Sequence, residues 1–230
     1  MKIKASLNYK KPTLKVALIG ASGFVGTALL NELLERGHEV TALTRDAANI
    51  KKEHQFLNVV QANILNDTEL AEKVQGHDAV ISAFNAGWTN PNLYEDFLNG
   101  SKTIQDGVKK SGVKRFIFVG GAGSLHTPDG GQFVDTPEFP EQIKPGATAA
   151  RDYLNHLKTE KELDWTFLSP ALEMHQGTSG ERKGKYRIGQ DTPVFDENGR
   201  SVASVEDTAL AIVDELEYPI HTRKRFTIAY

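Results

Sequence analysis

The stretch KVALIGASGFVGTALL, residues Lys15–Leu30, is the most informative part of this chain. The apolar run after the lysine is typical of a buried parallel strand, and it leads directly into Gly20, Gly23 and Gly26. Apolar residues at helical spacing follow over 27–37 and end on a glycine. A strand, a glycine-rich turn and a helix in this order predict the first half of a βαβ unit that binds a dinucleotide.

The three glycines have separate physical roles in such a turn. Gly20 permits the tight bend after the strand, and Gly23 lets the backbone approach a pyrophosphate at the positive end of the helix. Gly26 lets the helix pack closely on the strand. The predicted cofactor contacts of the turn are Gly20, Ser22, Gly23, Phe24, Val25 and Gly26. The alternative is a turn without a ligand, because glycine is common in ordinary turns.

Strand-like and helix-like patterns alternate along much of the chain. Strands are expected at 15–20, 38–45, 58–64, 78–84, 114–121 and 164–170, and helices at 27–37, 67–76, 92–112, 147–161 and 205–217. This alternation predicts right-handed crossovers and a parallel sheet that helices cover on both faces. The predicted fold is a three-layer, Rossmann-like, doubly wound α/β domain over 15–230, preceded by an N-terminal extension over 1–14.

Two glycine-rich segments interrupt the alternation. Residues 120–146 are rich in Gly and Pro and are too long for a simple connection, which is typical of functional loops. Residues 177–201 have hairpin-like patterns. We expect residues 120–146 and 175–200 to form the walls of an acceptor pocket. Ser204 and Asp207 have the spacing of a capping box that begins the last helix.

Composition narrows the classes of function. The 230 residues carry a formal net charge of −3, which gives no electrostatic reason to expect a nucleic-acid partner. The chain has no cysteine, and its seven histidines show no metal-ligand spacing, so we expect neither disulfides nor a metal site. No apolar run is long enough to span a membrane, and the basic N-terminus lacks an apolar signal core. We expect a cytoplasmic protein with a small-molecule partner, present as a monomer or a homodimer.

The residues after the second predicted strand decide which dinucleotide fits. Thr44 is expected at the strand end, followed by Arg45, whose forked donors suit the 2′-phosphate of NADP. Asp46 lies 20 residues after Gly26, which is the spacing of the acid that holds the ribose in NAD sites. We expect Asp46 to fall beyond the strand end and to point away. NADP(H) is therefore favoured over NAD(H), although Arg45 could instead be a solvated loop charge.

Several segments resemble one family over nearly the whole chain. They are GASGFVG, HDAVISAF, FVGGAGSL, FVDTPEFPEQIKP, LDWTFLSPA, GKYRIG and SVEDTALAIVDELE. By these motifs the chain resembles the NADH-flavin reductase-like branch of the atypical short-chain dehydrogenase/reductases, which is related to NmrA-type proteins and to biliverdin/flavin reductases. GGAGSL and VDTPEFP are the most specific of the motifs.

The resemblance implies further cofactor contacts at the ends of the later strands. Asn63 and Ile64 would lie beside the adenine, where relatives often carry Asp in place of the asparagine. The other implied contacts are Ser82, Ala83 and Phe84 along the ribose and pyrophosphate, Ser169 and Pro170 beside the nicotinamide, and Gly120, Gly121 and Lys144.

The chain departs from most short-chain dehydrogenases at the catalytic pair. Those enzymes use Tyr-x-x-x-Lys, in which the tyrosine donates a proton to a carbonyl and the lysine lowers its pKa. No tyrosine here has a lysine four residues later, and Tyr153 is followed at that position by Leu157. Alignment of PEQIKPGATAARDYL with the family pattern places Lys144 at the lysine position and Pro140 at the tyrosine position. We therefore expect the cofactor-binding lysine without the proton donor.

A missing proton donor argues against alcohol or ketone chemistry. It is compatible with hydride transfer from NADPH to a flavin- or quinone-like acceptor, whose ring delocalises charge. Ser124 is the remaining hydroxyl near the expected cofactor and, with Lys144, is a candidate catalytic residue; alternatively it satisfies only the loop backbone. Candidates to stack on the acceptor are Phe133, Phe139, Trp88 and His126, for which core or loop packing is the favoured alternative. Candidates to attract a flavin phosphate are Arg182, Lys183, Lys185 and Arg187, for which a solvated charged face is the favoured alternative.

Two other functions stay open at this point. An NmrA-type redox sensor would bind NADP(H) without turnover and report the nicotinamide ratio to a partner, and it also has no need of the tyrosine. Sugar-nucleotide epimerase or dehydratase chemistry is less favoured, because the tyrosine is missing. A compact acceptor pocket beside the nicotinamide would favour the reductase, whereas an occluded nicotinamide face with an exposed apolar patch would favour the sensor.

Overall fold

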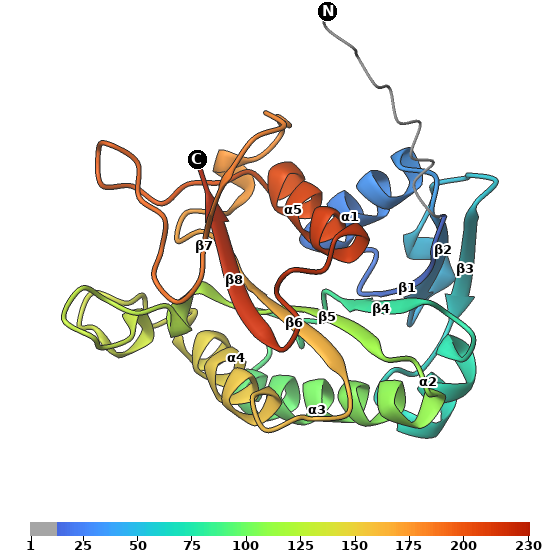
Figure 1. Cartoon of the computed structure of the whole chain (residues 1–230). Coiled ribbons are helices and arrows are strands. Elements are labelled where there is room, and N and C mark those ends of the chain that lie inside the picture. Colours follow the sequence, from blue (N-terminus) through green and yellow to red (C-terminus); the bar gives the residue numbers. More distant parts are fainter. Residues whose placement is uncertain (1–12) are drawn as a thin grey trace, which may run out of the picture.

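An eight-stranded sheet forms the middle layer of the protein in a computed structural model that describes residues 13–230 (Figure 1). The strands lie in the order β3-β2-β1-β4-β5-β6-β8-β7, and all neighbours are parallel except β7 and β8. Their bounds are β1 Lys15–Ile19, β2 Glu39–Thr44, β3 Leu57–Gln61, β4 Ala79–Ser82, β5 Arg115–Val119, β6 Asp164–Ser169, β7 Arg187–Gly189 and β8 Lys224–Ala229. The predicted N-terminal extension, 1–14, lies outside the described residues apart from its last two positions.

Helices cover both faces of the sheet (Figure 1). On one face α1 (Phe24–Glu35) packs beside α5 (Val205–Glu217), and on the other α3 (Leu93–Ser111) lies between α2 (Asp67–Val74) and α4 (Lys144–Leu157). Short 3₁₀ turns lie in the connections at Ala47–Asn49, Ala122–Ser124, Phe133–Asp135 and Gln176–Thr178. The predicted three-layer, doubly wound, Rossmann-like fold is confirmed.

The first strand shows why both faces of the sheet are buried. Val16 and Leu18 belong to the apolar core beneath α1 and α5, whereas Ala17 and Ile19 belong to the core beneath α2, α3 and α4. All four side chains are inaccessible to solvent. Successive side chains of a strand point to opposite faces, so a sheet with helices on both faces needs a continuous apolar run, as the sequence has here.

The sheet reverses its order of winding at β1. Strands β2 and β3 lie on one side of β1, and β4 and the later strands lie on the other. In open α/β sheets ligands bind at the carboxyl ends of the strands beside such a reversal. The glycine turn leaves β1 at this place, and the backbone N–H of Ala83, just after β4, donates to the Ile19 carbonyl at 2.9 Å. The fold therefore brings the glycine turn and the end of β4 together.

The structure adds two strands to the six that the sequence predicted. β8 pairs with β6, and β7 pairs antiparallel with β8. Residues 177–201 contain β7 as their single strand, so the hairpin-like interpretation of this segment is wrong. Its strand pairs with the C-terminal strand because β8, which is bonded to β6 on one side and has Phe226 and Ile228 in the core, presents its other edge.

The last helix begins with half of the predicted capping box. The Ser204 hydroxyl accepts a hydrogen bond from the Asp207 N–H at 3.1 Å, as predicted. The Ser204 N–H, however, donates to the Tyr230 hydroxyl and not to the Asp207 carboxylate. That carboxylate accepts from the N–H groups of Lys183 and Gly184 at 2.9 and 2.8 Å. Asp207 therefore attaches the segment before β7 to the start of α5.

Candidate functional site

Close backbone contacts fix the shape of the glycine turn. Gly20 has φ +79°, and a Cβ there would lie 2.6 Å from the Ala83 carbonyl oxygen. A Cβ at Gly26 would lie 1.9 Å from the Gly20 carbonyl oxygen, which is the close packing that the sequence predicted. A Cβ at Gly23 would meet that same oxygen at 3.3 Å, a contact that a small shift relieves. The fold requires Gly20 and Gly26, while Gly23 keeps the backbone open at the surface.

The N-terminus of α1 is free to receive an anion. Its N-cap, Gly23, has no capping side chain, and the first turn of the helix carries no acidic residue. By contrast, α2 and α5 are capped by Asn66 and Ser204 and carry acidic residues in their first turns. Ser22 and Gly23 are exposed. An accessible, uncapped helix N-terminus favours phosphate, so the residues present fit the pyrophosphate of a dinucleotide.

The end of β2 presents a free guanidinium. Thr44 is the buried last residue of β2, and its hydroxyl contacts the backbone of Asp46. The Asp46 carboxylate accepts from the Ala48 N–H at 3.0 Å and caps a 3₁₀ turn, so it lies beyond the strand end as predicted. Arg45 is exposed and forms no hydrogen bond or ion pair with the other residues that the structure describes. Its guanidinium is therefore available to a ligand.

The other predicted contacts on this side follow β3 and β4. Asn63 is exposed, with its amide oxygen bonded to the backbone two residues on, and Ile64 is buried beside it. Ser82 ends β4 and is fully buried. Ala83 forms the contact with the glycine turn described above, and Phe84 stacks on a phenylalanine of α3. All five residues lie at the carboxyl edge of the sheet.

The ends of β5 and β6 form the opposite side of the site. A Cβ at Gly120 would lie 1.8 Å from the Phe167 ring, so this position accepts only glycine without rearrangement. Gly121 is half-buried, and Pro170 is buried. Ser169 ends β6 with a buried hydroxyl that has no hydrogen-bond partner among the described residues. A buried hydroxyl without a partner is costly, so Ser169 suits a polar ligand at this edge.

Ser124 ends the 3₁₀ turn in the connection that follows β5. Its side chain is 1% exposed. The hydroxyl and the carbonyl oxygen of Ser124 both accept hydrogen bonds from the Arg225 guanidinium, at 3.0 and 2.7 Å. Arg225 comes from β8 and also pairs with Asp191. This placement favours the structural alternative for Ser124, in which the hydroxyl holds the loop.

The tyrosine of the usual catalytic pair has no counterpart at the predicted position. Tyr153 is fully buried in α4, and its hydroxyl lies 3.1 Å from the Gln105 side-chain oxygen. Burial also raises the pKa of the Tyr153 phenol well above its ordinary value. Because the ring is inaccessible and its hydroxyl donates to Gln105, this group is not presented to a substrate. Lys144 begins α4, and its ammonium group lies 3.2 Å from the Glu141 carboxylate at the surface. Pro140, at the tyrosine position, has no side-chain donor.

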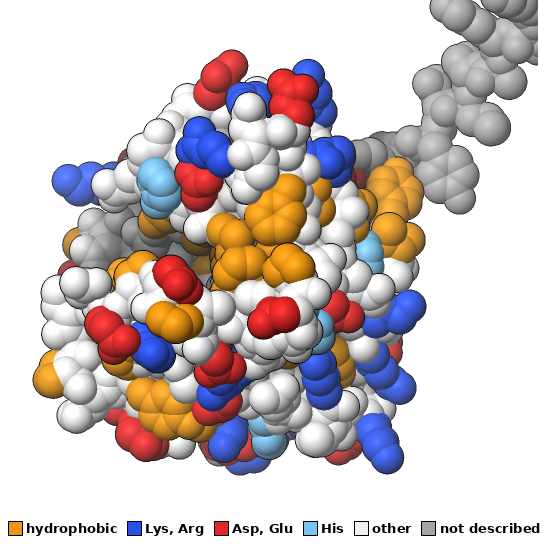
Figure 2. All heavy atoms as spheres, turned by 90° about the vertical axis from the view of Figure 1, so that its left-hand side faces the viewer, with side chains coloured by type: hydrophobic (Ala, Val, Ile, Leu, Met, Phe, Trp, Pro, Cys, Tyr) orange, Lys and Arg blue, Asp and Glu red, His pale blue; other side chains and the backbone are white. Residues whose placement is uncertain are grey.

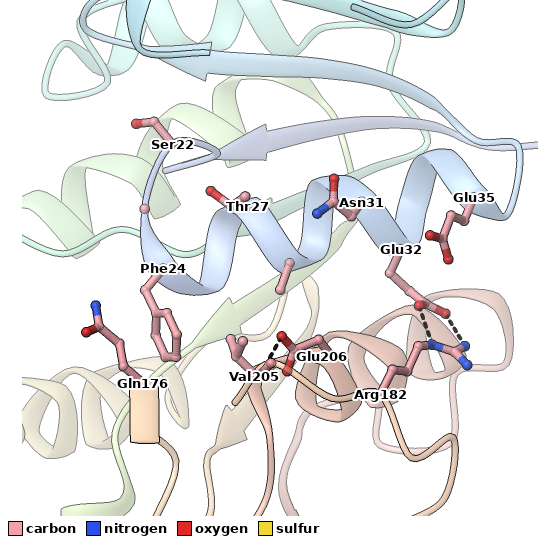
Figure 3. A pocket seen from close by; sticks show the side chains of 13 residues that line it. Ser22, Phe24, Thr27, Asn31, Glu32, Glu35, Gln176, Arg182, Val205 and Glu206 are labelled. Carbon is pink, nitrogen blue, oxygen red and sulfur yellow. Dashed lines mark hydrogen bonds and ion pairs between the residues drawn. The ribbon is translucent and has the colours of Figure 1, made fainter. Parts of the chain in front are cut away.

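A cavity of about 650 Å³ opens beside the glycine turn (Figure 3). It runs from Ser22 and Phe24 along α1 to Glu32, and Gln176 and Arg182 lie across from the helix. Its volume lies in the range of small-molecule sites. Of its lining, the sequence analysis identified only the three turn residues as cofactor contacts and Arg182 as a candidate for a flavin phosphate, because the rest come from separate segments that no motif links. The predicted contacts at the ends of β4, β5 and β6 are not part of this lining.

A buried carboxylate connects α1 to the segment across the cavity. Glu32 accepts two hydrogen bonds of 2.9 Å from Arg182 (Figure 3). It accepts a third, of 2.8 Å, from Arg36. Burial by itself raises the pKa of the Glu32 carboxyl, but the bonds from the two arginines outweigh burial and hold the pKa below its ordinary value. This Glu32–Arg182 clasp fixes the distance between α1 and the 176–182 segment.

The predicted basic cluster does not form a common patch. Arg182 is occupied by the clasp, and the Lys183 ammonium lies 3.8 Å from the centre of the Tyr230 ring. Arg187 donates to the backbone carbonyls of Phe195 and Tyr230. Lys185 is exposed. These contacts leave little of the cluster for a flavin phosphate.

The surface over the glycine-rich loops is mixed in character. Figure 2 shows this face with hydrophobic side chains gathered near its centre, a hollow beside them, and charges of both signs around. Of the four stacking candidates, Trp88 is exposed, and Phe133, Phe139 and His126 are half-buried. Among the described residues no group of three or more His, Cys, Asp or Glu could hold a metal ion, and no helix in that range is long and apolar enough to cross a membrane.

Comparison with known proteins identifies the relatives of this chain. A sequence family described as NAD(P)H-binding matches residues 20–217. The Bacillus subtilis protein YwnB is 35% identical over 217 residues, which cover 94% of this chain and 98% of the relative.

Two crystal structures share the fold over nearly their whole length. A protein from Bacteroides thetaiotaomicron, provisionally called an epimerase, is 49% identical with a TM-score of 0.88, and the match covers 95% of this chain and 98% of that one. A protein from Streptococcus pneumoniae, provisionally called an NADH-flavin reductase, is 34% identical with a TM-score of 0.78 over 94% and 99% of the two chains.

Proposed function

Because this chain belongs to the NAD(P)H-binding family of atypical short-chain dehydrogenase/reductases, we propose that it is an NADPH-dependent oxidoreductase that reduces a flavin- or quinone-like acceptor. One observation carries the proposal: an open dinucleotide turn is combined with the loss of the usual proton donor. Gly23 leaves the turn accessible, while Tyr153 is sealed in the core. The provisional name of the Streptococcus relative supports the same class of acceptor.

The chemistry requires binding and orientation more than acid catalysis. When bound, NADPH would supply a hydride that reduces the acceptor by two electrons and leaves the nicotinamide oxidised, with the accompanying proton coming from solvent. The N-terminus of α1 would hold the pyrophosphate, and the Ser169 hydroxyl at the end of β6, which has no hydrogen-bond partner among the described residues, would be available to the ligand. Holding the two rings at reaction distance is then the main contribution of the protein.

The free guanidinium of Arg45 supports NADPH as the preferred cofactor. Arginine binds phosphate oxygens through two parallel N–H groups, and the competing acid, Asp46, is engaged with the backbone. In this proposal Arg45 binds the 2′-phosphate and Asp46 takes no part in ribose binding.

A redox sensor is the second candidate, and the placement of Ser124 favours it. The hydroxyl is buried beneath Arg225, so neither it nor Tyr153 offers an acid to a substrate. A protein of this kind would bind NADP(H) and report its redox state through a protein partner. We do not propose epimerase chemistry, despite the provisional name of the Bacteroides relative, because this chain lacks the tyrosine that such chemistry uses.

The two candidates are separated by following the loss of reduced-nicotinamide absorbance. Purified protein is mixed with NADPH or NADH and with FMN, riboflavin or menadione. Turnover above the protein-free rate that saturates in both substrates, with NADPH preferred, is the expected result. Tight NADPH binding in a thermal-shift assay without reduction of any acceptor would contradict the reductase and favour the sensor.

A further inference from the structure

The loop after β4 presents an unusually exposed indole. Trp88 is 61% exposed, more than any other Phe, Tyr or Trp of the described residues. Leaving so large an apolar ring in water forgoes the free energy of burying it, and tryptophan is a residue type that is enriched at binding surfaces. The exposed indole of Trp88 is therefore a candidate contact for a ligand.

The indole lies against the first turn of α4. A Cβ built on Gly146 would lie 3.1 Å from the Trp88 ring and 3.1 Å from the Leu93 side chain. Gly146 is in the first turn of α4, and Leu93 is the first residue of α3. Both helices begin at the carboxyl edge of the sheet, where Ala83 contacts the glycine turn. Gly146 thus supports the ring at the same edge as the dinucleotide turn.

Hydrogen bonds of two asparagines hold the loop in place. The Asn85 side chain accepts from the Gly87 N–H at 2.7 Å, and Gly87 has φ +101°, which favours glycine. The Asn90 side chain donates to the Ala86 carbonyl at 3.3 Å and to the Asp96 carboxylate on α3 at 2.8 Å. These bonds cross the loop on both sides of Trp88 and attach it to α3 through Asp96, so the ring is presented without a large ordering cost.

We propose that Trp88, supported by Gly146 and Leu93, is the platform on which the planar ring of the acceptor stacks. This inference rests on the proposed function and names the acceptor subsite. The flat indole lies against the first turn of α4 and leaves most of its surface open to solvent. Such a surface suits a conjugated ring such as an isoalloxazine or a quinone. A sugar or an aliphatic carbonyl compound would gain much less from it.

Tryptophan fluorescence tests the platform without turnover. The chain has two tryptophans, and the second, Trp165, lies in β6 at 3% exposure. The protein is loaded with NADP⁺, so that no reduction occurs, and is titrated with FMN, riboflavin or menadione. We expect saturable quenching that disappears in Trp88→Phe, whose remaining emission comes from Trp165. Emission from the wild-type protein that none of the three compounds quenches beyond the inner-filter correction would overturn the proposal.

Kinetics give a second readout with a matched control. Trp88→Ala should raise the KM for the acceptor at least tenfold, leave the KM for NADPH within twofold, and be partly rescued in Trp88→Phe. Phe56→Ala is the control, because Phe56 is 40% exposed but precedes β3 at the opposite edge of the sheet, and it should change neither constant. An unchanged acceptor KM in Trp88→Ala would overturn the platform.

The outcomes distinguish this inference from the proposed function. Quenching by flavin without any turnover would support the platform and contradict the reductase, whereas turnover with an unchanged Trp88→Ala variant would do the reverse. Sedimentation of the same proteins addresses a second copy of the chain as the occupant. A wild-type dimer that Trp88→Ala converts to a monomer, with the acceptor KM unchanged, would assign the indole to subunit contact and overturn the proposal.

Discussion

At the scale of single residues, Arg45 carries the preference for NADPH. Arg45→Ala should raise the Kd for NADPH about tenfold to a hundredfold, since a charge-assisted hydrogen bond contributes about 1.5–3 kcal/mol. The Kd for NADH should change less than twofold. Titration calorimetry with both cofactors measures this difference, and Lys51→Ala, which removes an exposed charge nearby in the same connection, is the control. Equal losses for the two cofactors would exclude Arg45 as the phosphate-binding residue.

Gly23 tests whether the glycine turn holds a ligand. Its missing side chain has only a marginal contact, at 3.3 Å, so Gly23→Ala should cost about 1 kcal/mol of stability through the poorer N-cap, or about 2–4 °C in melting temperature. NADPH affinity should fall at least tenfold, because the added methyl group occupies the open backbone. Gly26→Ala is the structural comparison and should lose much more stability. Unchanged NADPH binding in folded Gly23→Ala would show that this backbone holds no phosphate.

The glycine turn could be predicted because it is local, whereas the surroundings of Ser124 could not. Spacing within seven residues is enough to predict roles for Gly20 and Gly26. The partner of Ser124 is Arg225, 101 positions away on a strand that the sequence analysis did not predict. Likewise, nothing near Tyr153 in the sequence indicates its full burial, which comes from packing against β5 and β6. The sequence therefore identified candidate side chains for the site but could not show which of them are buried in the core.

At the scale of elements, the Glu32–Arg182 clasp connects α1 to the 176–182 segment. Arg182→Met should destabilise the protein by about 1–2 kcal/mol, because Glu32 keeps its bond to Arg36 but loses two others. Hydrogen exchange should accelerate selectively over 176–184. Lys185→Met, which removes an exposed charge three residues further along the chain, is the control and should leave exchange unchanged. If exchange over 176–184 is the same in both variants, the clasp does not hold the segment.

The elements that the sequence predicted are those with their own periodicity. The strands through β6 and the five helices follow apolar patterns at the expected spacing, although α4 begins at Lys144, three residues before the predicted start. β7 has only three residues and pairs with β8 across about 35 intervening positions. Its existence depends on the edge that β8 presents. Sequence patterns carry little information about a strand that is fixed by a distant partner.

At the scale of the whole molecule, a buried hydrogen-bond network links α3 and α4 to the residues that precede β6. The Tyr153 hydroxyl on α4 donates to the Gln105 side chain on α3, and Gln105 donates in turn to Glu160 at 2.9 Å. Lys109 lies 3.2 Å from the same carboxylate. Glu160 precedes β6, so this network joins two helices to the start of that strand. The ionisation of Glu160 should therefore affect the stability of the whole fold.

The pKa of Glu160 gives stability a defined dependence on pH. Burial by itself raises this pKa, but hydrogen bonds from the Glu162 backbone, Gln105 and Lys109 outweigh it and lower the pKa to about 2, below the ordinary 4.5. A carboxyl whose pKa is lower in the folded state stabilises the protein fully above the unfolded value, and this contribution is lost as the pH falls from about 4.5 to about 2.

Glu160→Gln should therefore lower the free energy of unfolding at pH 7 by about 2 kcal/mol, and its difference from wild type should shrink as the pH falls through that window. Urea unfolding at pH 7, 4.5 and 3 measures the difference directly. Glu162→Gln is the matched control, because its exposed carboxylate shares Lys109 but contributes little through a solvent-screened pair. A Glu160→Gln difference that stays constant from pH 7 to pH 3 would mean that the buried network acts through packing and not through the charge of Glu160.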